Sequence, residues 1–130
     1  MFSHEKLIVY RKSIEFVAWT QPKLEALPGK VSARDQLERA STSVPLNLAE
    51  GNAKFSKAER ARFFQVAHGS AVEWSACLDV LVARALMRLE DAAEGKSQLV
   101  EIVNMLLALP NRLGCRASED GSVYLPEEED

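Results

Sequence analysis

Long stretches of strong helix formers, broken at only a few points, most constrain what this 130-residue chain can fold into. Between the breaks, Ala, Leu, Glu, Arg and Lys predominate, and these residues favour helix. The breaks coincide with most of the six glycines and five prolines. No segment alternates apolar and polar residues over the length of a strand, and no hairpin turn joins two strand-like segments. The sequence therefore predicts an all-α fold.

Apolar residues recur every three or four positions in four segments, which predict helices at 4–19, 32–50, 57–89 and 96–113. The first helix is expected to resume after Pro22 and to end at Leu27, and a turn is expected at 91–95. Pro45 lies inside the second helix, where its ring favours a kink. Short connections favour antiparallel neighbours, so we expect an up-down-up-down antiparallel four-helix bundle over residues 1–113.

The first and third predicted helices carry apolar residues on more sides than one bundle core needs. The expected core face of the first helix is formed by Leu7, Tyr10, Ile14, Val17 and Ala18. A helix with two apolar sides fits between its own bundle and a neighbouring molecule. We therefore expect a homo-oligomer whose contacts include Val9, Phe16, Val66, Val72, Val80 and Met87.

Charge is distributed unevenly along the chain, whose net charge is −3. Residues 114–130 contain one base and six acids, a net charge of −5, whereas residues 1–113 contain fifteen bases and thirteen acids, a net charge of +2. Runs of like charge are usually solvated and mobile, so residues 114–130 are predicted to form an acidic, disordered tail. The alternative is a tail that shields a basic patch until a partner displaces it.

Polar residues on the second and third helices are the most specific local feature of the sequence. Two polar faces are predicted by the three- and four-residue spacing of Ser43, Asn47 and Glu50 and of Gly69, Ser70 and Glu73. Gly69 would allow the two helices to approach closely, and Arg39 would neutralise the carboxylates. One interpretation is a structural polar layer that sets the register of the helices. The other is a pair of acids, Glu50 and Glu73, at an active site.

A cluster of positive charge lies where the second predicted helix gives way to the third. Its members are Lys54, Lys57, Arg60 and Arg62, opposed by Glu59 alone, so residues 54–62 carry a net charge of +3. The positive end of the helix dipole adds to this charge, and the phosphate groups of RNA or DNA are ligands that fit it. The alternative is an ordinary solvated helix start. Phe55 and Phe63 are expected in the core rather than as stacking surfaces for bases.

Several functional classes lack the residues they need in this sequence. The chain has no glycine-rich phosphate-binding loop, no Glu-x-x-His pair for a di-iron site, no Ser-His-Asp arrangement and no Cys pair with metal-binding spacing. We therefore expect no catalytic residues, no metal and no cofactor, in a protein that is not an enzyme. Two isolated cysteines, and the lack of an apolar stretch of about 20 residues, favour a cytoplasmic protein that does not enter a membrane.

The segment that spans the second helix resembles a known family. Residues 36–51 read QLERASTSVPLNLAEG, and residues 67–73 read AHGSAVE. They are similar to the pattern Q-L-R-R-A-x-x-S-I-x-x-N-I-A-E-G followed by A-x-G-S-x-x-E. This pattern is that of the rRNA intervening-sequence proteins, which are encoded in insertions within bacterial 23S ribosomal RNA genes and elsewhere in genomes. The resemblance extends over residues 7–109 and departs at Glu38 and His68, where bases are usual.

The resemblance implies a left-handed four-helix bundle that assembles into a ring, commonly a homopentamer. The family is distantly similar to the accessory variability determinant of diversity-generating retroelements, a basic pentamer that works with a reverse transcriptase and nucleic acid. The first hypothesis is thus a non-enzymatic oligomeric scaffold or accessory protein associated with RNA, DNA or a nucleic-acid enzyme. The second is a protein-interaction ring without a nucleic-acid role. The third is an enzyme that uses Glu50 and Glu73, although no nucleophile or base accompanies them.

Overall fold

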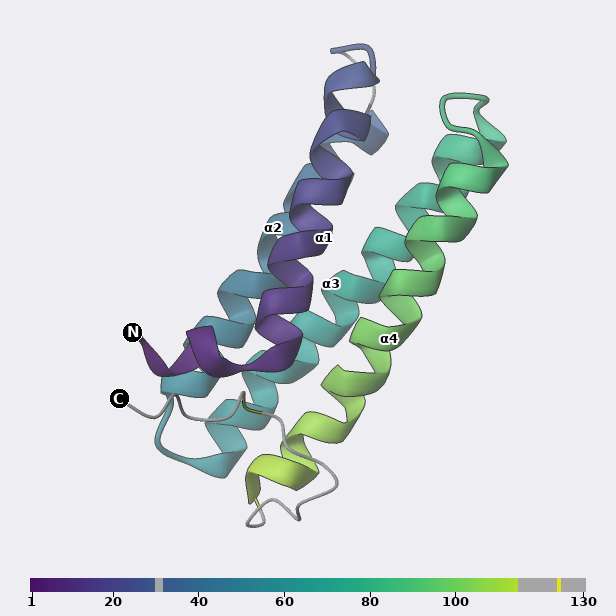
Figure 1. Ribbon diagram of the computed structural model, residues 1–130. Helices are drawn as coiled ribbons and strands as arrows, with labels where there is room; N and C mark the ends of the chain where they lie inside the picture. The colour runs from purple at the N-terminus through teal and green to yellow at the C-terminus, as the bar shows by residue number, and fades with distance from the viewer. Residues whose placement is uncertain (30–31, 115–123, 125–130) are drawn as a thin grey trace.

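The structure, a computed structural model, describes residues 1–29, 32–114 and Tyr124, and for residues 110–114 it describes the backbone alone. Its helices are η1 (Ser3–Lys6, a 3-10 turn), α1 (Ile8–Ala26), α2 (Ser32–Ala53), α3 (Lys57–Ala83) and α4 (Leu89–Gly114). Figure 1 shows the four α-helices side by side, with consecutive helices running in opposite directions. The described residues form no strand, only an isolated antiparallel bridge between Leu7 and Tyr124. For these residues, the prediction of an all-α fold with four helices is confirmed.

Two prolines lie inside helices without ending them. Pro22 is within α1 and Pro45 within α2, and both helices continue beyond them, so the break expected near Pro22 is wrong. A proline removes one hydrogen bond and crowds the preceding turn. Beyond Pro22 the chain buries Leu24 and Leu27, and beyond Pro45 it buries Leu48. Burial of such a side chain contributes about 1.5–3 kcal/mol, which offsets the cost of the proline.

The connection between α3 and α4 lies six to seven residues earlier than predicted. α3 ends at Ala83 rather than at Leu89, and α4 begins at Leu89 rather than at Lys96. The turn expected at 91–95 is therefore part of α4.

The end of α3 explains this difference. Ala85 adopts the left-handed conformation, with a φ of 59°. Its N–H donates to the carbonyl of Val82, and the N–H of Leu86 donates to the carbonyl of Leu81. These bonds form a Schellman motif, in which glycine usually occupies the left-handed position. Because alanine is the strongest helix former, the sequence here predicts continuation rather than an end.

Gly95 has a packing role within α4. A Cβ atom at this position would lie 2.7 Å from Cη2 of Trp19 and 2.9 Å from Cδ1 of Leu78. The glycine therefore allows α4 to pack closely against side chains of α1 and α3.

The buried face of α1 differs from the predicted one. Its buried residues are Val9, Ser13, Phe16, Thr20 and Leu24. Ile14 and Ala18, which were expected in the core, are exposed. Val9 and Phe16 therefore pack in the core of their own subunit, which corrects the prediction that they contact another copy.

Two hydroxyl groups make this face of α1 compatible with burial. The Ser13 hydroxyl donates to the Tyr10 carbonyl at 2.7 Å, and the Thr20 hydroxyl donates to the Phe16 carbonyl at 2.8 Å. A buried polar group that finds a partner in its own helix avoids most of the cost of leaving water. Oγ1 of Thr20 also accepts a hydrogen bond from the Trp74 indole N–H at 3.2 Å, which joins α1 to α3.

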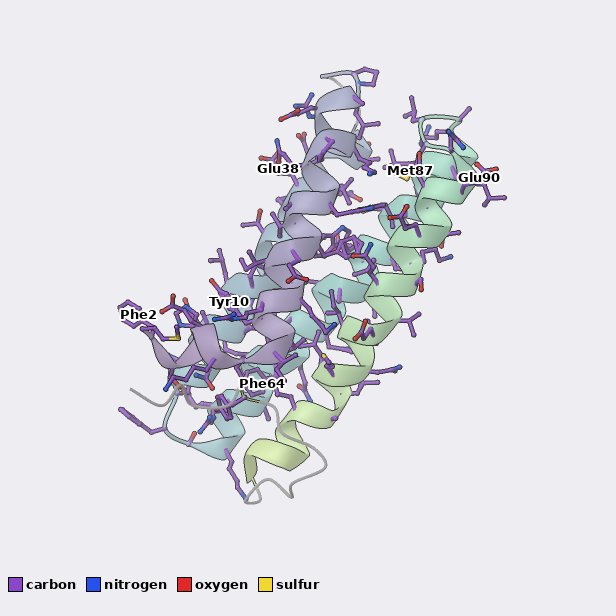
Figure 2. The ribbon with its side chains drawn as sticks, viewed as in Figure 1. Phe2, Tyr10, Glu38, Phe64, Met87 and Glu90 are labelled. Carbon is purple, nitrogen blue, oxygen red and sulfur yellow. The ribbon has the colours of Figure 1, made fainter. Side chains whose placement is uncertain are left out.

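The core is one apolar cluster contributed by all four α-helices, and its largest fully buried side chains are Trp74, Phe16 and Phe64. Figure 2 places Phe64 toward one end of the bundle and Met87 at the other. None of the helices in the described part of the chain is both long and apolar enough to cross a membrane. The predicted acidic tail, residues 114–130, lies outside the described residues except at Gly114 and Tyr124.

Candidate functional site

The polar faces of α2 and α3 meet at two serines and an asparagine. The hydroxyl oxygens of Ser43 and Ser70 are 2.8 Å apart. Nδ2 of Asn47 donates to the backbone oxygen of Ser43 at 2.8 Å and to its hydroxyl oxygen at 2.9 Å. All three side chains are half-buried. The structure therefore brings these members of the predicted polar layer together.

The glycine that permits close packing of α2 against α3 is not the predicted one. A Cβ atom on Gly69 would meet nothing within 4 Å, so this exposed glycine is not a point of close approach within the subunit. A Cβ atom on Gly51 would lie 2.7 Å from Cε1 of Phe64 and 2.9 Å from Cβ of Phe63. Close approach thus occurs at the end of α2, where Gly51 lies about two helical turns beyond Ser43.

The charged members of the predicted polar layer are not drawn into it. Arg39, Glu50 and Glu73 are exposed, and they form no ion pair or hydrogen bond with other described side chains. The charge of Glu73 affects the pKa of Cys77, which lies four residues further along α3. Burial of Cys77, followed by the charge of Glu73, raises the pKa of the Cys77 thiol. In the part of the chain that the structure describes, no three His, Cys, Asp or Glu residues are grouped as metal ligands.

The basic cluster lies at the turn between α2 and α3. Lys57 and Arg62 are exposed, and Lys54 is half-buried. Nζ of Lys54 is 5.1 Å from the ring centroid of Phe63, and the guanidinium carbon of Arg62 is 5.6 Å from the same centroid. We call Lys54, Lys57 and Arg62 the outer basic cluster.

Arg60, the fourth predicted member of the cluster, is directed into the end of the bundle. It is half-buried, and its Nη2 donates to Oδ1 of Asn52 at 3.4 Å. The same oxygen accepts a hydrogen bond from the Tyr124 hydroxyl at 2.9 Å, and Nδ2 of Asn52 donates to Oγ of Ser3 at 3.0 Å. Sequence reasoning missed Asn52, because its partners lie far away along the chain. Arg60 thus has a hydrogen-bond partner at the end of the bundle, and its role in phosphate binding stays a prediction.

Phe55 contradicts the expectation that it is a core residue, because it is fully exposed in the turn between α2 and α3. Phe63 is half-buried beneath the outer basic cluster. The turn therefore presents an aromatic ring and several cations at one end of the bundle.

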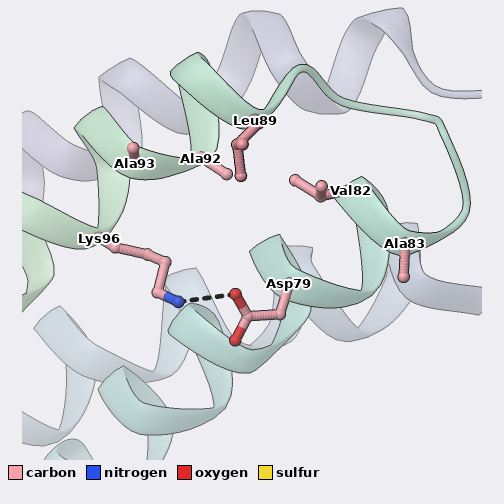
Figure 3. A pocket seen from close by; sticks show the side chains of 7 residues that line it. All are labelled: Asp79, Val82, Ala83, Leu89, Ala92, Ala93 and Lys96. Atoms are coloured by element: carbon pink, nitrogen blue, oxygen red, sulfur yellow. Dashed lines mark hydrogen bonds and ion pairs between the residues drawn. The ribbon is translucent and has the colours of Figure 1, made fainter.

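A shallow groove between α3 and α4 lies at the other end. It has a volume of about 470 Å³ and is lined by Asp79, Val82, Ala83, Leu89, Ala92, Ala93 and Lys96. Figure 3 shows its mainly apolar walls, with an ion pair of 2.7 Å between Lys96 and Asp79 at the side. Leu89 begins α4 rather than ending the third predicted helix, so the sequence did not indicate this groove.

Exposed apolar residues continue along the outer sides of both helices. They are between 41% and 67% exposed and comprise Val66, Val72 and Val80 on α3 and Leu89, Val100 and Leu107 on α4. Met87, also predicted at an interface, is half-buried and packs against the core of the subunit.

Comparison with known proteins gives a family and a solved structure of similar fold. The sequence model of the family described as 23S rRNA-intervening sequence protein matches residues 5–108. A solved structure of a protein of unknown function, from the S23 ribosomal protein family of Bacteroides thetaiotaomicron, is similar in fold, with a TM-score of 0.74. The two chains are 22% identical, and the likeness covers 79% of this chain and 98% of that one. No curated protein matches the chain.

Proposed function

The chain belongs to the 23S rRNA-intervening sequence protein family, and from this premise we propose that it is a non-enzymatic, homo-oligomeric scaffold. The assembly we propose is a ring of five subunits in the cytoplasm. The observation that carries the proposal is the exposed apolar surface along α3 and α4, which remains although the subunit already has a complete core.

The spacing of the exposed residues on α4 supports this role. Leu89, Val100 and Leu107 are separated by eleven and seven residues, so they lie in one row along the helix. Several exposed apolar residues in one row at the surface of a folded subunit often mark an interaction site. A second copy of the chain can cover it, and contacts between two different surfaces of identical copies close into a ring when the rotation permits.

The test is the molar mass of the protein in solution, measured by light scattering at micromolar concentration. Five chains of 14.4 kDa give 72 kDa, and a wild-type monomer would end the proposal. Val100→Glu and Leu107→Glu are expected to reduce the mass, because they place charge on the row. Ile14→Glu is the matched control, since Ile14 is a comparably exposed residue on α1 and its substitution should leave the mass unchanged.

A second function, association with RNA or DNA, is favoured by the outer basic cluster. Its members have no ion-pair partner within the described chain, and a ring would repeat the cluster once per subunit. Binding should weaken as salt rises, and Lys57→Glu combined with Arg62→Glu should reduce both the affinity and its salt dependence. An oligomer that binds no nucleic acid at low salt would instead support a ring that interacts only with proteins.

A further inference from the structure

Phe55 is the most exposed large apolar side chain in the described chain, and it lies in the turn that carries the outer basic cluster. Proteins that hold unpaired nucleotides combine such cations with aromatic rings on which bases stack. We propose that this turn binds single-stranded nucleic acid, with Phe55 stacking on a base and the outer basic cluster contacting phosphates. The proposal rests on the nucleic-acid association proposed above and specifies the form of the ligand.

The turn is ordered on both sides of the exposed ring. Before Phe55, the Lys54 N–H donates to the Gly51 carbonyl at 3.2 Å. After it, the Ser56 hydroxyl accepts a hydrogen bond from the Glu59 N–H at 3.1 Å and caps α3. Phe55 is therefore carried on a short turn with an ordered backbone rather than on a long loop. Because this backbone is already ordered, it loses little conformational entropy when a base stacks on the ring.

The cations beside Phe55 are also held in place. Lys54 and Arg62 both contact the half-buried ring of Phe63, at 5.1 Å and 5.6 Å from its centroid. Two positive charges thus lie over one aromatic side chain, and one of them, on Lys54, belongs to the residue that precedes Phe55. This arrangement suits a strand whose phosphates follow the surface while one base turns toward Phe55.

The chemistry of the turn favours a single strand over a duplex or a membrane. In a duplex the faces of the bases are already stacked on each other, so a protruding ring must first unstack a base step, a cost that a single strand does not impose. Attachment to a membrane requires a broad apolar face or two anchoring signals. Here Phe55 is one fully exposed ring among charged residues, which is too small an apolar surface for stable insertion.

The experiment measures fluorescence anisotropy of labelled oligo(dT) and oligo(U) of about 12 nucleotides, and of a duplex of the same length. Wild-type protein should bind the single strands more tightly than the duplex. Phe55→Ala and Phe55→Leu should weaken single-strand binding by about 5- to 150-fold, because stacking on one aromatic ring contributes about 1–3 kcal/mol. Phe55→Trp should retain it. Each variant changes only an exposed side chain, so folding is not at risk.

Lys57→Glu and Arg84→Glu form a charge-matched pair. Both residues are exposed, but they lie at opposite ends of α3, and only Lys57 belongs to the outer basic cluster. Lys57→Glu should weaken binding and reduce its salt dependence between about 50 and 200 mM, whereas Arg84→Glu should do neither. Equal effects of the two changes would mean that net charge alone governs binding, and would overturn the proposal.

Three other results would also overturn it, and they separate it from the broader function. Duplex binding as tight as single-strand binding, with no effect of Phe55→Leu, would leave nucleic-acid association intact and remove the stacking role. Absence of all binding at low salt would remove both. Binding to vesicles of phosphatidylcholine and phosphatidylserine that Phe55→Leu preserves, without oligonucleotide binding, would assign the turn to a membrane instead.

Discussion

Replacing Thr20 with valine tests how the structure buries polar groups between α1 and α3. Valine has nearly the shape of threonine but cannot accept the hydrogen bond from the Trp74 indole N–H. Trp74 is fully buried, so this donor would be left without a partner in the core. Such a loss costs about 1–3 kcal/mol. With a denaturant slope of about 2 kcal/mol per molar, the urea midpoint should fall by about 0.5–1.5 M.

Thr42→Val is the matched control for this change. The Thr42 hydroxyl donates to the Glu38 carbonyl at 2.8 Å, which is the same four-residue pattern as in Thr20, but Thr42 is exposed. Its replacement should change the free energy of unfolding by less than about 0.5 kcal/mol. The unfolding of the Thr20→Val and Thr42→Val variants in urea is followed by circular dichroism at one protein concentration. Equal effects of the two substitutions, or an unchanged midpoint for Thr20→Val, would refute the reasoning.

The remaining predictions concern glycine packing and the buried thiol. Gly51→Ala should destabilise the protein by about 1–3 kcal/mol, because the new Cβ would lie 2.7 Å from Phe64, whereas Gly69→Ala should stabilise the helix by about 0.5–1 kcal/mol. Urea unfolding of both variants checks this, and a shift of the same sign in both would contradict it. Burial raises the pKa of the Cys77 thiol above the usual 9.0. The thiol therefore ionises more readily in the unfolded chain than in the folded one. The contribution of the neutral thiol to stability is complete at neutral pH and is lost as the pH rises above 9.0. In a Cys115→Ser background, alkylation of Cys77 at pH 9 should therefore be slower in the folded protein than in urea, and equal rates would contradict the burial.

The four helices could be predicted because their signal is repeated over many residues. The periodic apolar positions in α2 follow from spacing within one helix, and so do the two polar faces that carry Ser43 and Ser70; the contact between these serines depends on how α2 packs against α3. Features that depend on the conformation of one residue could not be predicted in this way. The end of α3 depends on Ala85 adopting a conformation that usually selects glycine, and nothing in its local sequence indicates this.

The face that α1 buries could not be read from polarity alone. Ser13 and Thr20 count as polar in any pattern, yet their hydroxyls bond to carbonyls of the same helix and can enter the core. Counting them as exposed rotated the expected core face toward Ile14. Phe55 was misplaced for the opposite reason, because an aromatic residue beside a turn is buried only if another element covers it.

The hydrogen bonds on Asn52 have a consequence for the order in which the chain folds. They join Asn52 to Ser3 and Tyr124, which are 49 and 72 positions away in the sequence. Closing loops of this length is slow compared with forming a helix, so these contacts are expected to complete after the α-helices have docked. The backbone amides of Asn52 and Ser3 should then exchange with deuterium earlier than the amides at the centre of α3. This end of the molecule is therefore expected to close last during folding and to open first.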